Sequence, residues 1–289
     1  MRKYLLSIAG ITLLLSGCDF SKIPYLNNNQ KEETTQTDEQ KDNEPIVDQE
    51  NNGQNDSTEG AAGDSTQDQD SLPEGPTLEA IFFNDVKEVD GKQVIQNPLN
   101  VLALVNKMFA LPESYNPTDL VKPNVSFSFG DQTIEKSLMR QEAAVALENM
   151  FAEAKTSGIE LYAVSGYRSY ERQRIIFDAE VKKSGEEKAM QVVAVPGNSE
   201  HQSGLAMDIS AKSANLSLTE SFGETNEGKW LAANAHKYGF ILRYPKGKET
   251  ITGYQYEPWH FRYVGVDAAQ TIFEKNITLE EYFDIVEKI

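Results

Sequence analysis

The segment Ser199–Ser210 (SEHQSGLAMDIS) contains a histidine and an aspartate seven residues apart, His201 and Asp208, in a chain with 3 histidines among 289 residues. If residues 205–210 form a strand, its alternate apolar side chains face a core and Asp208 faces the opposite side. Gly204 allows a sharp turn of the backbone just before that strand. The preceding loop can therefore bring His201 back toward Asp208, as a metal site would require.

A second segment, WHFRYV at residues 259–264, alternates aromatic side chains with His260 and Arg262. We expect the aromatic side chains to pack in the core, which places His260 and Arg262 together on the other face. Glu257 comes shortly before this segment, and Pro258 argues against regular strand geometry at that point. Glu257 is therefore expected on a lead-in turn, from which it can reach the same cavity as His260.

Together the two segments supply two imidazoles and one carboxylate, a ligand set that suits Zn²⁺ with a fourth position free for water. Bound zinc lowers the pKa of that water toward neutrality. A nearby carboxylate such as Glu257 can accept its proton and pass it to a leaving amine. The spacing alone is not specific, because unconnected polar residues are the alternative, and the same ligands accept Mn²⁺, Co²⁺ or Ni²⁺. The HExxH helix of another metalloprotease class is absent from the sequence.

Four further basic side chains need an interpretation. Arg168 lies at the end of an expected strand, and its guanidinium can bind a free carboxylate or a developing oxyanion. Arg262 is a second candidate for this role because it shares a face with His260, whereas Arg243 is interpreted as structural. His236 lies near the C-terminus of an expected helix, where the dipole favours its charge, and it is also interpreted as structural.

The clearest predicted helix spans residues 139–154, where apolar residues recur at three and four positions. Other helices are predicted at 76–83, 100–109, 169–183, 186–193 and 228–238, two more close the chain, and strands are predicted at 159–164, 205–210, 240–243 and 259–264. Residues 111–123 contain three prolines and are expected to be ordered but irregular. Strands separated by unequal helices and loops predict an α+β fold, a single domain with a central antiparallel sheet flanked by helices.

The N-terminus has the pattern of a secretion signal. Two basic residues precede a short apolar run, and residues 15–18 (LSGC) resemble a bacterial lipobox. We therefore expect residues 1–18 to be a lipoprotein signal peptide and Cys18 to be lipidated, which would tether the chain to a membrane outside the cytoplasm. An uncleaved anchor is the alternative, although the apolar run is short for a membrane span.

Residues 19–75 are predicted to be a disordered acidic tether. Residues 27–75 contain 14 acidic and 2 basic side chains with almost no large apolar residue, so they cannot bury enough surface to fold. They also account for most of the net charge of −18. The absence of a basic patch argues against a nucleic-acid partner. Residues 76–289 are long enough for one catalytic domain, which we expect to be a monomer.

Three motifs, in order, resemble the VanY-type zinc carboxypeptidases of bacterial cell walls and the related LD-carboxypeptidases. They are SGYRSYERQ (165–173), SEHQSGLAMDIS (199–210) and EPWHFRYVG (257–265), and the resemblance spans most of residues 98–265. It implies a small α+β fold with a central antiparallel sheet, shared with the zinc domain of Hedgehog proteins.

The resemblance also implies a role for each site residue. His201, Asp208 and His260 would be the zinc ligands. Glu257 would be the catalytic base, and Arg168 would bind substrate and stabilise the oxyanion. A further set would contact or line the peptide site: Gln173, Ser199 and Trp259.

The function implied is removal of the C-terminal D-alanine from peptidoglycan stem peptides. L,D-cleavage of tetrapeptides is slightly favoured, because the lipoprotein layout and the residues Arg168, Gln173 and Ser199 resemble the LD-carboxypeptidase branch. Three alternatives remain: a D,D-carboxypeptidase acting on pentapeptides, a peptidoglycan endopeptidase, and a zinc domain that binds wall peptides without cleaving them. Glu257 argues against the last, because a pure binding module needs no base beside the metal.

Overall fold

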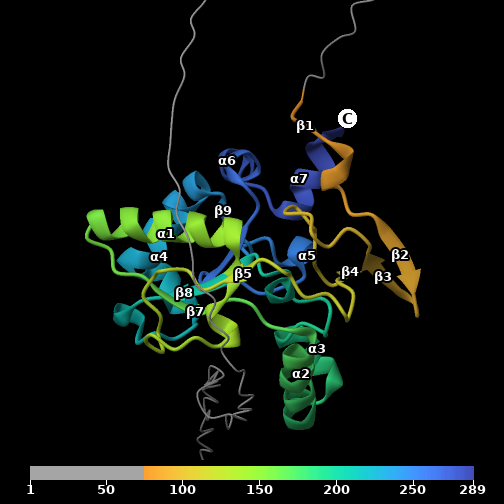
Figure 1. Cartoon of the computed structure of the whole chain (residues 1–289), viewed down its shortest axis with the longest axis horizontal. Helices are drawn as coiled ribbons and strands as arrows, with labels where there is room; N and C mark the ends of the chain where they lie inside the picture. The colour runs from red at the N-terminus through yellow and green to blue at the C-terminus, as the bar shows by residue number, and fades with distance from the viewer. Residues whose placement is uncertain (1–74) are drawn as a thin grey trace, which may run out of the picture. The chain divides into compact units, whose positions relative to one another are not determined.

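The structure, a computed structural model, describes residues 75–289 (Figure 1). Its centre is a four-stranded sheet in the order β7-β8-β10-β9, in which every neighbouring pair is antiparallel. The strands are β7 (Tyr162–Ser165), β8 (Ala206–Ser210), β9 (Phe240–Leu242) and β10 (His260–Tyr263). All four were predicted within a few residues, and so was the α+β class. The two segments singled out above thus lie side by side, as β8 and β10.

Helix α1 (Gln141–Thr156) packs against the sheet and closes the main core. Its apolar positions Ala143, Leu147 and Met150 are fully buried with Met207 of β8 and Phe261 of β10. The alternation of both strands is therefore as expected, with their apolar side chains on this face. Their polar side chains Asp208 and His260 must then lie on the opposite face.

The remaining helices are α2 (Tyr170–Ser184), α3 (Glu186–Val192), α4 (Asn226–Asn234), α5 (Glu249–Thr252), α6 (Val266–Lys275) and α7 (Leu279–Ile285). Of these, α4 also packs on this core, α6 and α7 form a second hydrophobic cluster, and α2 and α3 project together at one end of the domain (Figure 1). Short 3₁₀ helices are η2 (Ala80–Phe82), η3 (Glu135–Ser137), η4 (Glu200–Ser203), η5 (Lys212–Ala214), η6 (Glu220–Glu224) and η7 (Ala235–Tyr238). The predicted helices at 169–183 and 186–193 are confirmed as α2 and α3, and that at 228–238 as α4 continued by η7. Ser169 caps α2 by accepting a hydrogen bond from the Arg172 amide, which starts the helix directly after Arg168.

Three small sheets were not predicted. They are the parallel pair β1 (Thr77–Leu78) and β11 (Glu287–Lys288), the sheet β2 (Val86–Val89), β3 (Lys92–Ile95) and β4 (Phe109–Ala110), and the pair β5 (Leu120–Val121) and β6 (Met139–Arg140). The β2–β3 hairpin turns at Asp90-Gly91, both with positive φ, a turn sequence that favours tight hairpins. Apart from β5, residues 111–123 are irregular, as expected.

The helix predicted at 100–109 was wrong. Its backbone groups are bound elsewhere: the Asn100 and Asn106 side-chain oxygens accept from nearby amides, and Arg262 donates to the carbonyls of Val101 and Ala103. Side chains that bind local backbone compete with helical hydrogen bonds. These contacts hold the segment next to Arg262 of β10 without a helix.

The helix predicted at 76–83 was also wrong. The backbone of β1 pairs with β11 at the C-terminus, a contact between the two ends of the domain that no local pattern indicates. Only the single turn η2 remains of the expected helix.

Among residues 75–289, no helix is both long and apolar enough to cross a bilayer. The expectations for Cys18, the signal peptide and most of the tether lie outside the described residues.

Candidate active site

The geometry of the sheet brings Asp208 and His260 together. They are direct cross-strand neighbours in the antiparallel pair of β8 and β10, with His260 Nδ1 3.1 Å from Asp208 Oδ1. Directly opposed residues of an antiparallel pair project to the same face. Two residues that are 52 positions apart in sequence therefore meet at one point on the sheet.

His201 completes a group of three, as predicted. It lies on η4, which ends at Gly204 in a left-handed conformation (φ 71°), so that the chain turns into β8. His201 Nε2 is 3.4 Å from Asp208 Oδ2. One possible ligand atom from each of His201, Asp208 and His260 lies within 4.8 Å of the others, and all three residues are buried.

Each imidazole is held through the nitrogen that faces away from Asp208. His201 Nδ1 is 2.7 Å from the carbonyl oxygen of Gly166, and His260 Nε2 is 3.2 Å from Glu200 Oε2. The two rings are nearly perpendicular, with 88° between their planes. The nitrogens left facing Asp208 are Nε2 of His201 and Nδ1 of His260.

Gly166 is required for this arrangement. A Cβ at this position would overlap the carbonyl oxygen of Leu138 and lie 2.8 Å from the Met207 side chain. Glycine therefore lets the backbone after β7 approach closely enough for its carbonyl to contact His201.

The donor set fits a zinc ion. Two imidazole nitrogens and one carboxylate, buried and converging, are typical of a catalytic zinc site with a fourth position for water or substrate. Hydrogen-bonded partners behind metal-binding histidines are the usual second feature of such sites. The group of His201, Asp208 and His260 has both.

Burial and mutual charge shift the ionisation of all three residues in the metal-free protein. Burial lowers the pKa of His201 to about 3. Burial disfavours the ionised Asp208, but the two imidazoles and Arg168 outweigh it and its pKa lies below the usual value. Burial also opposes the charge of His260, yet its hydrogen bonds with Asp208 and Glu200 raise its pKa to about 9.

Glu257 lies beside the group on the turn before β10, as expected. Its Oε2 is 3.9 Å from His260 Nδ1, and its side chain is 25% exposed. Burial raises the pKa of Glu257 to about 7 and the charge of Asp208 acts in the same direction, against His260 and Arg168. A carboxylate that gains and loses a proton near neutral pH can serve as a general base and acid.

Arg168 is aligned by its neighbours. Its guanidinium donates to Gln173 Oε1 at 3.0 Å and to Ser165 Oγ at 3.2 Å, and its amide donates to the His201 carbonyl. Gln173 in turn donates to the carbonyl of Ala194, beyond α3. The predicted contact residue Gln173 is thus buried and holds the arginine.

The other two predicted contact residues, Ser199 and Trp259, lie close to the metal group in the sequence. Ser199 is buried at the start of η4, two residues before His201. Trp259 is half-buried and packs against the main core, and its carbonyl accepts from the Ile209 amide. Their contacts with a peptide stay predictions.

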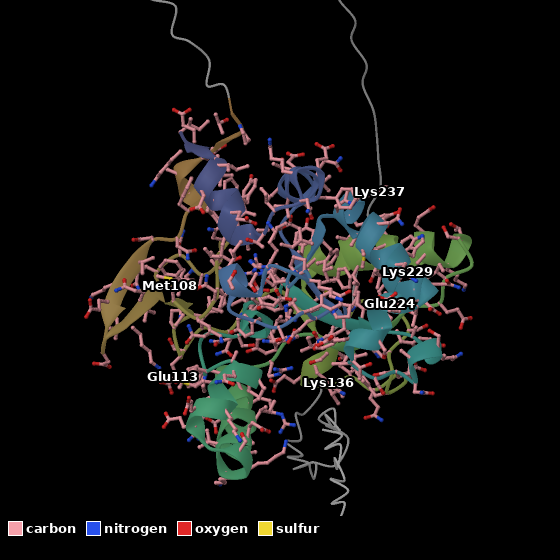
Figure 2. All side chains as sticks on the ribbon, turned by 180° about the vertical axis from the view of Figure 1, so that it is seen from behind. Met108, Glu113, Lys136, Glu224, Lys229 and Lys237 are labelled. Atoms are coloured by element: carbon pink, nitrogen blue, oxygen red, sulfur yellow. The ribbon has the colours of Figure 1, made fainter. Side chains whose placement is uncertain are left out.

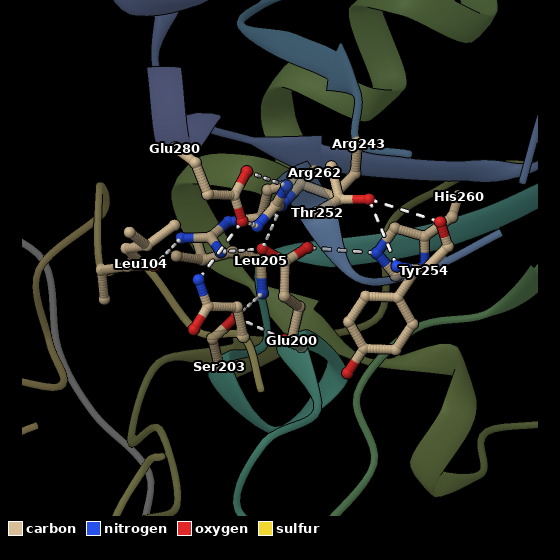
Figure 3. A network of polar contacts seen from close by, with 12 residues as sticks. Leu104, Glu200, Ser203, Leu205, Arg243, Thr252, Tyr254, His260, Arg262 and Glu280 are labelled. Carbon is tan, nitrogen blue, oxygen red and sulfur yellow. Dashed lines mark hydrogen bonds and ion pairs between the residues drawn. The ribbon is translucent and has the colours of Figure 1, made fainter. Parts of the chain in front are cut away.

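Sequence reasoning missed Glu200. This residue is 2% exposed, and its carboxylate accepts from Arg243 Nε at 2.7 Å and Arg262 Nη1 at 2.8 Å (Figure 3). The interpretation of Arg243 as structural is confirmed. Arg262 shares the face of His260 but is fully buried among Glu200 and backbone carbonyls, so it cannot meet a substrate. The only hint in the sequence was the position of Glu200 next to His201, and position alone does not distinguish it from an ordinary surface glutamate.

His236 lies away from the metal group, as predicted. Its ring is on η7 and stacks on Phe273 of α6, with 3.6 Å between ring centroids.

The chain as a whole is similar to known proteins. The VanY family model, described as D-alanyl-D-alanine carboxypeptidase, matches residues 136–266. YodJ of Bacillus subtilis (strain 168), named as a carboxypeptidase, is 60% identical over 213 residues, which are 74% of this chain and 78% of YodJ.

Two solved structures extend the comparison. That of the LdcB LD-carboxypeptidase, which concerns peptidoglycan recognition, is 60% identical with a TM-score of 0.72 and covers 74% of this chain and 99% of LdcB. That of a mutant of the vancomycin-resistance D,D-pentapeptidase VanY in complex with Zn(II) is 36% identical with a TM-score of 0.51, covering 63% and 98%.

Proposed function

Because the chain belongs to the VanY family of D-alanyl-D-alanine carboxypeptidases, we propose that it removes the terminal D-alanine of peptidoglycan tetrapeptides, as an L,D-carboxypeptidase. The chain is a carboxypeptidase acting on peptidoglycan, and zinc is its cofactor. The observation that supports the proposed mechanism most is the convergence of His201, Asp208 and His260 beside Glu257. The L,D preference is supported by the 60% identity with LdcB, against 36% with VanY.

In this mechanism His201, Asp208 and His260 hold the metal. When bound, zinc supplies a Lewis acid that acidifies a water molecule and polarises the peptide carbonyl. Glu257 accepts a proton from the attacking water and delivers it to the amine of the departing D-alanine. Arg168 binds the terminal carboxylate or the developing oxyanion, with its guanidinium oriented by Gln173.

Changing Arg168 to methionine is expected to lower kcat/KM by about 10²–10³-fold, as the loss of an oxyanion donor does. Steady-state kinetics on a tetrapeptide separate its two possible contacts. A rise in KM alone would assign Arg168 to the terminal carboxylate, and a fall in kcat would assign it to the oxyanion. Arg172→Met, four residues further along the chain, is the matched control. The assignment would be contradicted if kcat/KM of both variants stayed within about threefold of the wild-type value, because the expected loss is much larger.

Zinc affinity is expected to depend on pH, because ligands must lose their protons before they bind metal. The pKa of His260 is about 9 in the metal-free protein, so zinc must displace one proton from it at neutral pH. Between about pH 8.5 and 6.5, each decrease of one pH unit should weaken the affinity for zinc roughly tenfold. Competition with a chelator of known affinity at several pH values measures this, and a flat profile would contradict it.

The scissile bond is tested with two defined muropeptides, one ending in a tetrapeptide and one in a pentapeptide. Mass spectrometry of the products, with and without a chelator, identifies the bond cleaved. Loss of one alanine from the tetrapeptide alone is the expected result. Loss from the pentapeptide alone would make the protein a D,D-carboxypeptidase, and cleavage within the peptide or of a cross-link would make it an endopeptidase.

We further propose that the domain is a monomer held to the outer face of the cell membrane by a lipid on Cys18. The support is the basic, apolar and LSGC pattern of residues 1–18 and the acidic composition of residues 27–75. Changing Cys18 to alanine in the producing cell should abolish incorporation of labelled fatty acid into the protein. Undiminished labelling of this variant would exclude Cys18 as the site of the lipid.

A further inference from the structure

Glu200 connects a metal-binding histidine to a buried group of charges. Its side chain points toward His260 and two arginines (Figure 3). One carboxylate oxygen, Oε1, accepts from Arg243 at 2.7 Å and from Arg262 at 2.8 Å. The other oxygen, Oε2, lies 3.2 Å from His260 Nε2. Each oxygen of Glu200 therefore has a separate task.

The two arginines are themselves fully engaged. Arg243 donates from both terminal nitrogens to Glu280 on α7, at 2.9 and 2.6 Å. Arg262 donates to the backbone carbonyls of Val101, Ala103 and Tyr263. Two guanidinium and two carboxylate charges thus balance within the group, and both guanidiniums stay on the Oε1 side of Glu200.

Packing alone does not explain this arrangement. Burying charged groups carries a large desolvation cost, and a protein with apolar residues of similar size in their place is often equally stable. By contrast, surface pairs such as Glu224 and Lys229 (Figure 2) contribute little. What the buried group of charges achieves is to fix one carboxylate oxygen, Oε2 of Glu200, next to Nε2 of His260.

We propose that Glu200 is a positioning residue for His260. It holds the proton on Nε2, so that the lone pair of Nδ1 faces Asp208 and the metal. This inference rests on the proposed function, in which His260 is a zinc ligand. A carboxylate behind a ligating histidine fixes its tautomer and raises its basicity, and such outer partners are worth about 10–100-fold in metal affinity.

The substitution Glu200→Gln makes a sharp test. The two guanidiniums can only donate hydrogen bonds, so they require the new amide oxygen on their side, and the amide NH₂ then faces His260 Nε2. That nitrogen must become an acceptor, which moves the ring proton to Nδ1 and removes the lone pair aimed at the metal. Zinc affinity, measured by chelator competition, should fall about 10–100-fold.

Glu280→Gln is the matched control. It alters the same buried group through Arg243 but does not touch His260. Its zinc affinity should stay within about threefold of wild type, below the loss typical of a ligand's own partner, even if its melting temperature falls. Equal losses of zinc affinity in both variants, or none in Glu200→Gln, would overturn the positioning role.

Nitrogen-15 NMR of the zinc-loaded wild-type protein gives a second readout that does not depend on a variant folding. The expected spectrum has a proton on Nε2 of His260 and the metal on Nδ1, and the reverse tautomer would overturn the proposal. His260→Ala keeps the two ideas apart. If His260→Ala retains zinc with native affinity, the ligand assignment in the proposed function fails. If His260→Ala loses zinc while Glu200→Gln keeps native zinc affinity, only the positioning role fails.

Discussion

Replacing Glu257 with glutamine is expected to lower kcat by about 10²–10⁴-fold while zinc stays bound, because a carboxamide cannot accept the proton of the attacking water. Glu257 Oε2 lies 3.9 Å from His260 Nδ1, beside the three-residue metal group and outside it. Its pKa, raised to about 7 by burial, suits transfer of a proton in both directions near neutral pH.

The measurement pairs turnover of a tetrapeptide with the zinc content of the same sample. Glu160→Gln, which changes a glutamate that is 68% exposed, is the control for the loss of one negative charge. Wild-type turnover in Glu257→Gln would exclude a proton-transfer role. Loss of zinc together with activity would instead make Glu257 a metal ligand.

Replacing Asp208 with alanine is expected to abolish both zinc binding and activity. Asp208 contacts both imidazoles, with Oδ1 3.1 Å from His260 and Oδ2 3.4 Å from His201, and it supplies the only negative charge among the three proposed ligands. Mutating a residue that only hydrogen-bonds to a metal ligand typically weakens metal binding about 10–100-fold, and removing a ligand itself should weaken it more.

Chelator competition measures the zinc affinity of this variant, and circular dichroism checks its fold. Asp131→Ala, at an exposed position, is the matched control. An Asp208→Ala protein that is folded, saturated with zinc and fully active would contradict the proposed ligand set.

The sequence indicated the metal group because each part of it obeys a local rule. Strand alternation placed Asp208 and His260 opposite the core, and the left-handed turn at Gly204 allowed His201 to return toward them. Pro258 indicated the turn that holds Glu257. The register that puts Asp208 directly against His260 joins distant segments, and no spacing rule gives it.

The parts that sequence reasoning missed depend on distant partners. Residues 100–109 have the composition of a helix, but Arg262 binds two of their carbonyls across the domain. Glu200 looks like a solvent-facing glutamate until two arginines from β10 and the end of β9 surround it. In both cases a long-range ionic or polar contact overrides the local pattern.

Anomalous diffraction at the zinc absorption edge, from crystals of the wild-type protein grown with zinc, tests the proposed metal centre most directly. We expect one strong anomalous peak that lies about 2.0–2.2 Å from each of three groups, His201 Nε2, the Asp208 carboxylate and His260 Nδ1, as in other zinc sites. Glu257 should lie next to that peak without bonding to it. A zinc peak bonded to other residues, or none at these three, would contradict the proposed metal centre and the mechanism that depends on it.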